Sequence, residues 1–199
     1  MDPPHGNAFQ CKLICVGDCH VGKTTMLLRY LKDQADQNIP ATLGVSYIHR
    51  KIVLNGNTYH LTVSDTAGQE KFAPLVPMYY NRADFAFIVF DLTSPPSFER
   101  VKFWESQLAL AKNYLERPIQ RVVVGNKCDL KERIAVSQDI IKKYCAELGL
   151  KYYEISALTG ENVNEMWKDI LTHGNWEPVA NVDFEPSPDP PAKPGKRCC

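Results

Sequence analysis

A glycine-rich segment that ends in Lys-Thr is the first part of the sequence whose residue types can do chemistry. Residues 17–24 read GDCHVGKT and match the pattern G-x-x-x-x-G-K-[ST] in full. In such a loop, successive backbone N–H groups curl around phosphate oxygens, and the following helix adds partial positive charge. Lys23 can bring a full charge to the terminal phosphates, and Thr24 can offer its hydroxyl to Mg²⁺. The predicted phosphate-binding residues are Gly17, Asp18, Cys19, His20, Val21, Gly22, Lys23, Thr24 and Thr25.

Two bulky side chains, those of Cys19 and His20, stand in the middle of this segment. They do not argue against phosphate binding, because the loop wraps its ligand with backbone atoms and the side chains can point away. His20 could also be a general base or a metal ligand, although a solvated bystander is the commoner role in such a place. Cys11, Cys15 and Cys19 have the spacing of a possible metal site, but the apolar run around the first two favours small hydrophobic residues in a buried strand.

A second motif, DTAGQE at residues 65–70, follows the apolar segment YHLTVS. An acidic residue at a strand end can hold Mg²⁺ through water, which is the role we expect for Asp65. Gly68 would let a backbone N–H approach the γ-phosphate, and Gln69 would lie where it can orient an attacking water. The predicted catalytic residues are therefore Gln69 and Lys23. Asp65 also fits the N-cap of a helix, and the sequence leaves that alternative open.

A third motif, NKCD at residues 126–129, follows the apolar segment RVVVGN. The carboxylate of Asp129 can accept two hydrogen bonds from guanine, one from N1–H and one from the exocyclic amine. Adenine lacks this donor pair, so the residue would select the base. Asn126 and Lys127 complete the predicted base site, with the lysine stem along the base. Such a short motif also occurs as a polar turn, but its place after two other nucleotide motifs favours guanine.

The composition limits the remaining classes of function. The chain has 199 residues, and its 23 Lys and Arg balance its 23 Asp and Glu, so no charge excess favours nucleic acid as a partner. No apolar run approaches the ~20 residues that span a bilayer. The N-terminus has neither the basic start nor the apolar stretch of a signal peptide. Seven cysteines, an odd count, argue against a disulfide framework and indicate a reducing, cytosolic setting.

The elements that must position these motifs alternate between strands and helices. Asn55-Gly56, the strongest short hairpin signal, separates the second and third strands. The pattern predicts an α/β fold with a mostly parallel sheet, helices on both faces and one antiparallel edge, and every motif at the carboxyl end of a strand. The predicted strands cover 11–17, 44–54, 59–65, 85–91, 119–126 and 151–156, and the predicted helices 24–33, 97–115, 136–148 and 162–172.

Three segments make up the predicted organisation. Residues 1–9 form a short N-terminal extension, and residues 10–173 form the folded domain. Residues 174–199 hold six prolines and little apolar content. We expect this last segment to be a flexible tail that ends in Cys-Cys and reaches at most about 80 Å.

The three motifs together resemble those of the Ras-superfamily small GTPases, over roughly residues 10–173. Within that superfamily the chain is most similar to the Rab family, through DTAGQEKF followed by PMYYNRA, through TLGVSY at 42–47, and through the terminal KRCC. The resemblance implies a P-loop NTPase fold of the small-G-domain type, with a six-stranded sheet. It implies a slow GTP hydrolase that switches between GTP and GDP forms in vesicle trafficking.

The resemblance also assigns roles to single residues. Thr42 would bind Mg²⁺ in the GTP form, and Ser156, Ala157 and Leu158 match the loop whose backbone contacts the guanine oxygen. Cys198 and Cys199 would carry prenyl groups that attach a monomeric protein to the cytoplasmic face of an intracellular membrane, endosomal or another secretory or endocytic one. Residues 36–48 and 66–82 would contact effectors, exchange factors, GTPase-activating proteins and GDI-type proteins.

Several positions depart from the Rab pattern. Ala35 replaces an aromatic residue that packs on guanine, and Leu158 replaces the lysine of the SAK motif, so we expect weaker nucleotide affinity and faster GDP release. Cys19 occupies a position that is small in most relatives, which predicts slow intrinsic hydrolysis. Ser64 replaces a tryptophan that packs with two aromatics, here Tyr47 and Tyr79, so partner choice should be unusual.

Two other functions remain open from the residues alone. A P-loop metabolic kinase would need an acceptor site and lid arginines, and would have no need of Asn126, Lys127 and Asp129. A GTP-binding scaffold with little or no hydrolysis is compatible with Cys19, Ala35 and Leu158.

Overall fold

The computed structural model describes residues 6–32, 45–66, 83–111 and 118–179 of the chain. The strands are β1 (Ala8–Val16), β2 (Val45–Leu54), β3 (Asn57–Thr66), β4 (Phe85–Asp91), β5 (Gln120–Asn126), β6 (Lys151–Ile155) and β7 (Glu177–Val179). The helices are α1 (Lys23–Lys32), α3 (Pro95–Glu99), α4 (Val101–Ala111), α5 (Gln138–Glu147) and α6 (Val163–His173), with a short 3₁₀ helix at Lys131–Arg133. None of these helices combines the length and apolar character needed to cross a bilayer.

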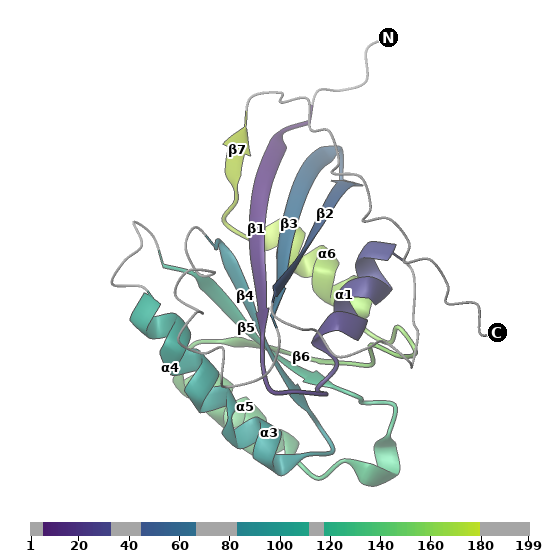
Figure 1. The fold of residues 1–199 in the computed structure, drawn as a ribbon, viewed down its shortest axis with the longest axis vertical. Helices are drawn as coiled ribbons and strands as arrows, with labels where there is room; N and C mark the ends of the chain where they lie inside the picture. The colour runs from purple at the N-terminus through teal and green to yellow at the C-terminus, as the bar shows by residue number, and fades with distance from the viewer. Residues whose placement is uncertain (1–5, 33–44, 67–82, 112–117, 180–199) are drawn as a thin grey trace, which may run out of the picture.

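The strands form one mixed sheet in the order β2-β3-β1-β4-β5-β6 (Figure 1). β1 pairs in parallel with β3 and β4, and the parallel ladder continues through β5 to β6. β2 and β3 form the antiparallel edge, joined by Asn55 at φ 51° and Gly56 at φ 77°. Positive φ at both central residues is the geometry that the Asn-Gly signal predicts. The predicted α/β fold with an antiparallel edge is confirmed.

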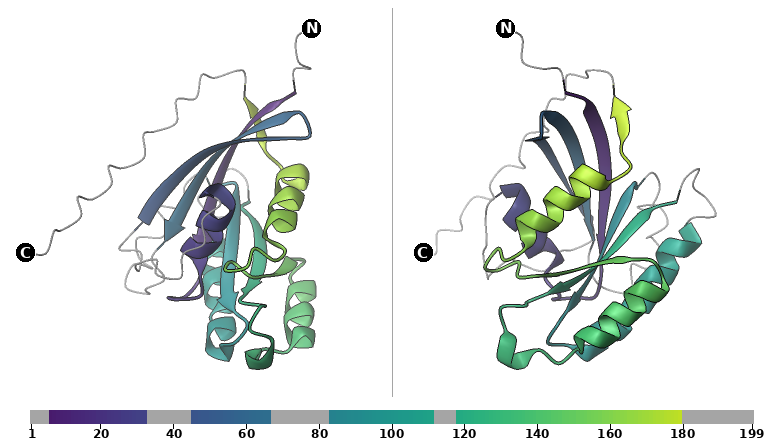
Figure 2. Two further views of the ribbon diagram at one scale, coloured as in Figure 1. Left: turned by 90° about the vertical axis from the view of Figure 1, so that its right-hand side faces the viewer. Right: turned by 180° about the vertical axis from the view of Figure 1, so that it is seen from behind.

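Helices cover both faces of the sheet, and each face has its own core (Figures 1 and 2). On β1, Cys11, Leu13 and Cys15 point to one face and pack with α1 and α6. Ile14 and Val16 point to the other face and pack with α4 and α5. This alternation follows from the two-residue period of a strand, and it explains why β4, between the two layers, is buried at every residue.

The single helix predicted over 97–115 is interrupted in the structure. α3 ends at Glu99 and α4 begins at Val101, with Arg100 between them. α3 starts with two prolines, which supply the fixed φ of a first helical turn. The hydrophobic spacing of the longer stretch could not reveal this break, because both pieces bury residues on the same side.

A seventh strand extends the sheet beyond the six that were predicted. β7 pairs antiparallel with the start of β1, where Ala8 lies opposite Val179 (Figure 1). Trp176, just before it, is buried, and its ring lies 5.9 Å from that of Phe85. The folded part therefore continues past residue 174, where the tail was expected to begin. β1 likewise begins at Ala8, inside the expected extension of residues 1–9.

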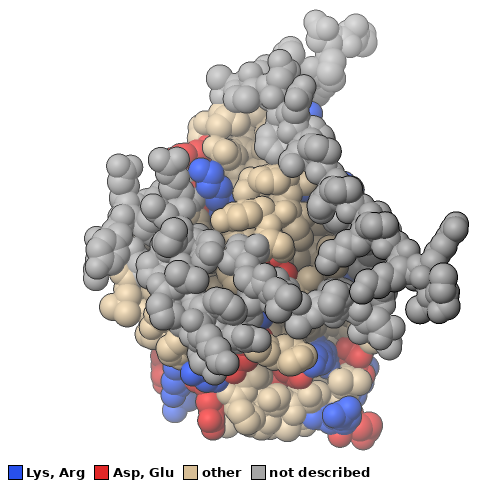
Figure 3. Space-filling model, viewed as in Figure 1, with Lys and Arg blue, Asp and Glu red and all other residues tan. Residues whose placement is uncertain are grey.

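Charged side chains of both signs lie intermixed over the described part of the face in Figure 3. Their mixture agrees with the equal numbers of acidic and basic residues in the sequence. The described part of this face therefore offers no field of one sign that would attract a charged partner.

Candidate nucleotide site

The glycine-rich segment forms a tight loop between β1 and α1. Gly17 has φ 145° and Gly22 has φ 93°, both in the range that side chains rarely adopt. A Cβ on Gly17 would meet the carbonyl oxygen of Val89 at 2.2 Å, and one on Gly22 would meet Asn126 Nδ2 at 2.3 Å. The backbone path of the loop therefore requires glycine at both ends, as the motif predicts.

The ammonium group of Lys23 lies inside this loop. Its Nζ donates to the carbonyl oxygens of Gly17, at 2.9 Å, and Asp18, at 2.8 Å. The residue is only 6% exposed, and burial lowers its pKa, a shift that neighbouring Cys15 and Asp65 oppose. A buried positive charge inside a loop of backbone N–H groups is suited to binding phosphate oxygens.

Thr24 and Asp65, two of the predicted metal ligands, lie in contact with each other. Thr24 Oγ1 donates to Asp65 Oδ2 at 2.6 Å, and Asp65 is fully buried at the end of β3. Thr66, which follows it, still belongs to the strand, so the alternative reading of Asp65 as a helix N-cap is wrong. A hydroxyl and a carboxylate are oxygen donors that Mg²⁺ prefers, so this pair fits that ion.

A cavity of about 220 Å³ joins the phosphate loop to the base-recognition segments. Asn126 links two of its walls: Nδ2 donates to the carbonyl oxygen of Val21 at 2.8 Å, and Oδ1 accepts from the N–H of Ala157 at 2.9 Å. The cavity is lined by His20, Gly22, Thr25, Asn126, Lys127, Asp129, Leu130, Ala157 and Leu158. Segments that are far apart in the sequence thus meet at the carboxyl ends of β1, β5 and β6, as predicted.

Lys127 is held by a residue that the sequence analysis did not single out. Its Nζ lies 2.6 Å from Asp91 Oδ2 at the end of β4, and its backbone is left-handed with φ 69°. Burial alone would raise the pKa of Asp91, but hydrogen bonds from Lys127 and Thr93 outweigh it and hold the pKa below its ordinary value. The aspartate at the end of the apolar run 85–91 was the available signal for this residue.

Arg29 is a second residue that the sequence analysis missed. From α1, its Nε donates to the carbonyl oxygen of Ala157 at 3.2 Å, and Nη2 also bonds that of Leu158. Within the segment 156–159, which contains these two carbonyl groups, the N–H of Thr159 donates to Ser156 Oγ at 3.0 Å. Leu158 is 36% exposed and lines the cavity where the SAK motif has a lysine, so this wall is more apolar than in that pattern.

The structure also places the residues that depart from the Rab pattern. Cys19 and His20 are exposed, and His20 is left-handed with φ 63°. Ser64 is buried opposite Tyr47 in the β2–β3 pair, and Tyr47 is 56% exposed. Several predicted positions lie outside the described residues: Ala35, Thr42, Gly68, Gln69, Tyr79, Cys198 and Cys199.

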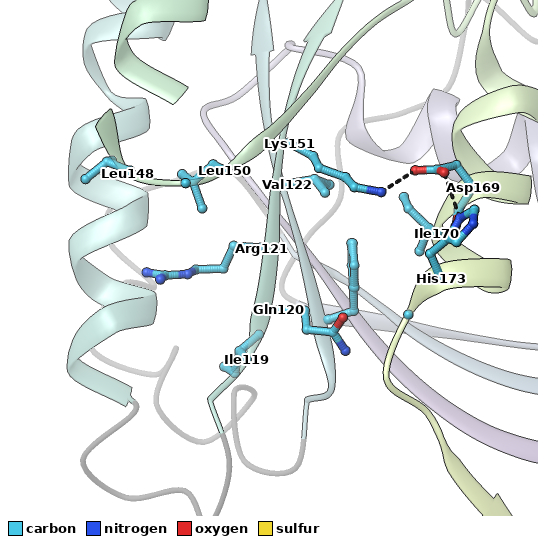
Figure 4. A pocket seen from close by; sticks show the side chains of 13 residues that line it. Ile119, Gln120, Arg121, Val122, Leu148, Leu150, Lys151, Asp169, Ile170 and His173 are labelled. Carbon is cyan, nitrogen blue, oxygen red and sulfur yellow. Dashed lines mark hydrogen bonds and ion pairs between the residues drawn. The ribbon is translucent and has the colours of Figure 1, made fainter. Parts of the chain in front are cut away.

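A second cavity of about 310 Å³ lies at the other ends of β5 and β6, against the end of α6 (Figure 4). Lys151 Nζ lies 2.8 Å from Asp169 Oδ2, and His173 Nδ1 lies 2.9 Å from the other oxygen of the same carboxylate. Figure 4 shows Arg121 turned away from these three residues. None of the three nucleotide motifs reaches this cavity.

Comparisons with known proteins agree with this geometry. A sequence profile of the Ras family matches residues 12–175. GTP-binding protein ypt5 of Schizosaccharomyces pombe is 39% identical, with 80% of this chain and 75% of that protein covered. Ras-related protein RabG2 of Dictyostelium discoideum is 35% identical over 77% of each chain. Human Ras-related protein Rab-21 is 34% identical, with 83% of this chain and 72% of that protein covered. The chain therefore belongs to the Ras family of GTP-binding, GTP-hydrolysing switch proteins, and its relatives include proteins with Rab names.

Proposed function

We propose that this protein is a Rab-type switch that binds guanine nucleotide with Mg²⁺ and acts in vesicle trafficking. The observation that carries the proposal is the 220 Å³ cavity, which brings Gly22 and Thr25 together with Asn126, Asp129 and Ala157. The phosphates would lie in the loop over Lys23, and the base would lie against Asp129. Thr24 and, through water, Asp65 would hold Mg²⁺, together with Thr42 in the GTP form.

The proposed reaction is attack of water on the γ-phosphorus of GTP. A bond forms from the water oxygen to phosphorus, the bond to the β,γ-bridging oxygen breaks, and GDP and phosphate leave. Gln69 would orient the water, and Lys23 would stabilise charge on the phosphates. Because Cys19 adds an exposed side chain to the phosphate loop, beside the position proposed for the water, we expect slow intrinsic hydrolysis.

The proposed switch acts through two segments. Contacts from Thr42 and Gly68 to the γ-phosphate and Mg²⁺ would order residues 36–48 and 66–82, and hydrolysis would release them. Effectors, exchange factors, GTPase-activating proteins and GDI-type proteins would read these segments and the exposed Tyr47 beside Ser64.

Membrane attachment is proposed to depend on the terminal cysteines. One lipid chain gives marginal binding and two give stable anchoring, so prenyl groups on both Cys198 and Cys199 would hold a monomer on an endosomal or related membrane. Val179, the last residue that the structure describes, lies opposite Ala8 at the start of β1, whereas the nucleotide cavity lies at the carboxyl end of that strand. An anchored protein could therefore present its nucleotide site and switch segments to the cytosol.

The test is the nucleotide content of protein purified without added nucleotide, released by denaturation and separated by chromatography. About one GDP or GTP per chain supports a tightly holding switch. Largely empty protein that binds added GTP with Mg²⁺ supports a weak, fast-exchanging switch, as expected from Ala35 and Leu158. Adenine nucleotide, or no binding, contradicts the proposal.

Two further measurements test the proposed hydrolysis and the proposed lipid attachment. Single-turnover hydrolysis of bound GTP, with Gln69→Leu as the reference, separates a slow enzyme from a scaffold that does not hydrolyse. Prenyl incorporation in cell extract and association with membranes, each compared between the native chain and a Cys198→Ser, Cys199→Ser variant, test the anchor. Equal membrane association of both proteins would contradict the lipid proposal.

A further inference from the structure

The carboxylate of Asp18 ties the phosphate loop to α4 and to the residue between α3 and α4. Asp18 Oδ1 accepts a hydrogen bond from Trp104 Nε1 at 2.9 Å. The same oxygen lies 3.3 Å from Arg100 Nε, which also donates to it. Two donors that are 82 and 86 residues away in sequence thus hold one oxygen of the second residue of the loop.

Both donors are themselves fixed by packing. Trp104 is 2% exposed and belongs to the core on the α4 and α5 face. The Arg100 guanidinium lies 4.3 Å from the centre of the Phe103 ring, over its face. Arg100 also stands at the interruption between α3 and α4, so its backbone is tied to both pieces. The contact therefore connects the loop to rigid elements rather than to free side chains.

The electrostatics explain why the loop needs this contact. Asp18 places a negative charge in a segment built to receive phosphates of the same sign. Arg100 offsets that charge, and the indole N–H of Trp104 holds the carboxylate, while Lys23 bonds the backbone carbonyl oxygen of the same residue. Bonds to a charged acceptor are stronger than neutral ones, but the side chains of Arg100 and Asp18 are 36% and 27% exposed, so solvent screens their ion pair. The bond from the buried indole of Trp104 is the firmer of the two.

We propose that Trp104 and Arg100 are positioning residues for the nucleotide site, and that they act through Asp18 to set how long bound nucleotide is held. The proposal rests on the function proposed above, since it needs a guanine nucleotide in the loop. Loss of either donor would remove one of the contacts that hold Asp18, so this part of the loop would open more often and release of GDP would become faster.

Trp104→Phe is the principal test, because it keeps the aromatic ring and removes only the N–H. The measurement is the dissociation rate of a fluorescent GDP analogue with Mg²⁺ present. We expect release to become about tenfold faster, the size of effect that one lost hydrogen bond to a charged group can produce. The matched control is Trp167→Phe. Trp167 is also fully buried, but its Nε1 has no hydrogen-bond partner within the described part of the chain. Removing this N–H should therefore leave the rate of GDP release within about twofold of the native rate.

A cycle with Asp18→Ala separates positioning from general loosening of the fold. If the indole acts through the carboxylate, Trp104→Phe should add nothing to release in the Asp18→Ala background. Additive effects, or native release in Trp104→Phe, would overturn the inference while leaving the nucleotide switch intact. Should Trp104→Phe fail to fold, Asp18→Ala and Arg100→Gln carry the same test, and native release in both would overturn it.

Tryptophan fluorescence gives a signal that should respond to GDP only if Trp104 is coupled to the nucleotide site, and not if Trp104 merely stabilises the fold. The chain has three tryptophans, so the Trp167→Phe, Trp176→Phe protein retains only Trp104. Its emission should change when GDP is removed, and the change should vanish with Asp18→Ala. Unchanged emission overturns the inference. A native protein that binds no guanine nucleotide at all would overturn the proposed function and the inference with it.

Discussion

The side-chain amide of Asn126 donates to the carbonyl oxygen of Val21, 2.8 Å away, and so fastens the phosphate loop to the base-recognition segment. The amide oxygen of the same residue accepts from Ala157, which adds a third segment. Asn126 is 2% exposed, so both bonds are made away from water. One buried amide thus fixes the relative positions of three loops that lie at the ends of different strands.

Replacing Asn126 by alanine should therefore weaken nucleotide binding at every part of the ligand. Two buried backbone groups lose their partners, each at a cost of about 1–3 kcal/mol, so we expect affinity for GDP to fall about a hundredfold or more. Equilibrium titration with a fluorescent GDP analogue measures this. Asn57→Ala, at the far end of the sheet, is the control and should bind as the native protein does. A loss below about threefold would mean that the amide does not hold the loops.

Asp129→Asn should change which base is bound. The carboxylate can accept from both N1–H and the exocyclic amine of guanine, whereas an amide offers one acceptor and one donor. Xanthine has a carbonyl in place of that amine, so the variant should lose GDP affinity by about 1–3 kcal/mol and gain affinity for XDP. Competition of GDP and XDP against a fluorescent analogue tests both halves. Parallel losses for the two bases would show that Asp129 stabilises the loop instead of reading the base.

Thr24→Val should remove the dependence of nucleotide retention on Mg²⁺. Valine matches threonine in shape and lacks the hydroxyl that lies 2.6 Å from Asp65. In the native protein, chelation with EDTA should accelerate GDP release by about tenfold or more, since the ion neutralises phosphate charge. In the variant, release should be fast with or without EDTA. Retained sensitivity to EDTA would place the ion on other ligands.

The sequence predicted most of this site because the motifs carry their own geometry. Gly17 and Gly22 are required by backbone conformation, and Asp65 lies at the end of a strand with an obvious apolar pattern. Parallel strands then bring these ends together without further information. The residues that were missed, Asp91, Arg29 and Trp104, act through contacts between elements that are distant in sequence. A pattern within one segment cannot report such contacts.

The sequence analysis ended the folded domain at residue 173, before β7, for a related reason. β7 has three residues and a central proline, so local propensity argues against a strand there. Within the described part of the chain it pairs with the first residues of β1, and the opposing residues Phe9 and Pro178 are 169 positions apart in the sequence. Trp176 before it was the usable signal, since a tryptophan is a costly residue to leave exposed in a proline-rich segment.

Trp176→Ala should lower the free energy of unfolding substantially, although the residue lies outside every nucleotide motif. Its side chain is 7% exposed, and its Nε1 donates to the carbonyl oxygen of Leu171 at 3.0 Å. Truncating a buried aromatic costs about 3–5 kcal/mol. Urea unfolding measures the loss, with Trp176→Phe as a milder control. A chain ending at Gly174 should be destabilised as much as the alanine variant, whereas one ending at Val179 should match the full chain.

Asp169 should make stability depend on pH through its contacts at the second cavity. Hydrogen bonds from Lys151 and then Tyr153 lower its pKa from 3.8 to about 2. A group whose pKa is depressed by folding stabilises the native state above its unfolded value, and this contribution is lost as pH falls from about 4 to about 2. Because the side chain is 33% exposed, we expect at most about 1 kcal/mol at neutral pH.

Asp169→Asn should therefore lower the free energy of unfolding at pH 6, and the difference from the native protein should shrink as pH falls toward 2. Lys151→Gln provides the matched change on the other partner. If the ion pair is the cause, the double variant should lose little more than either single one. A difference that stays constant between pH 6 and pH 3 would mean that Asp169 acts through packing or neutral hydrogen bonds rather than through its charge.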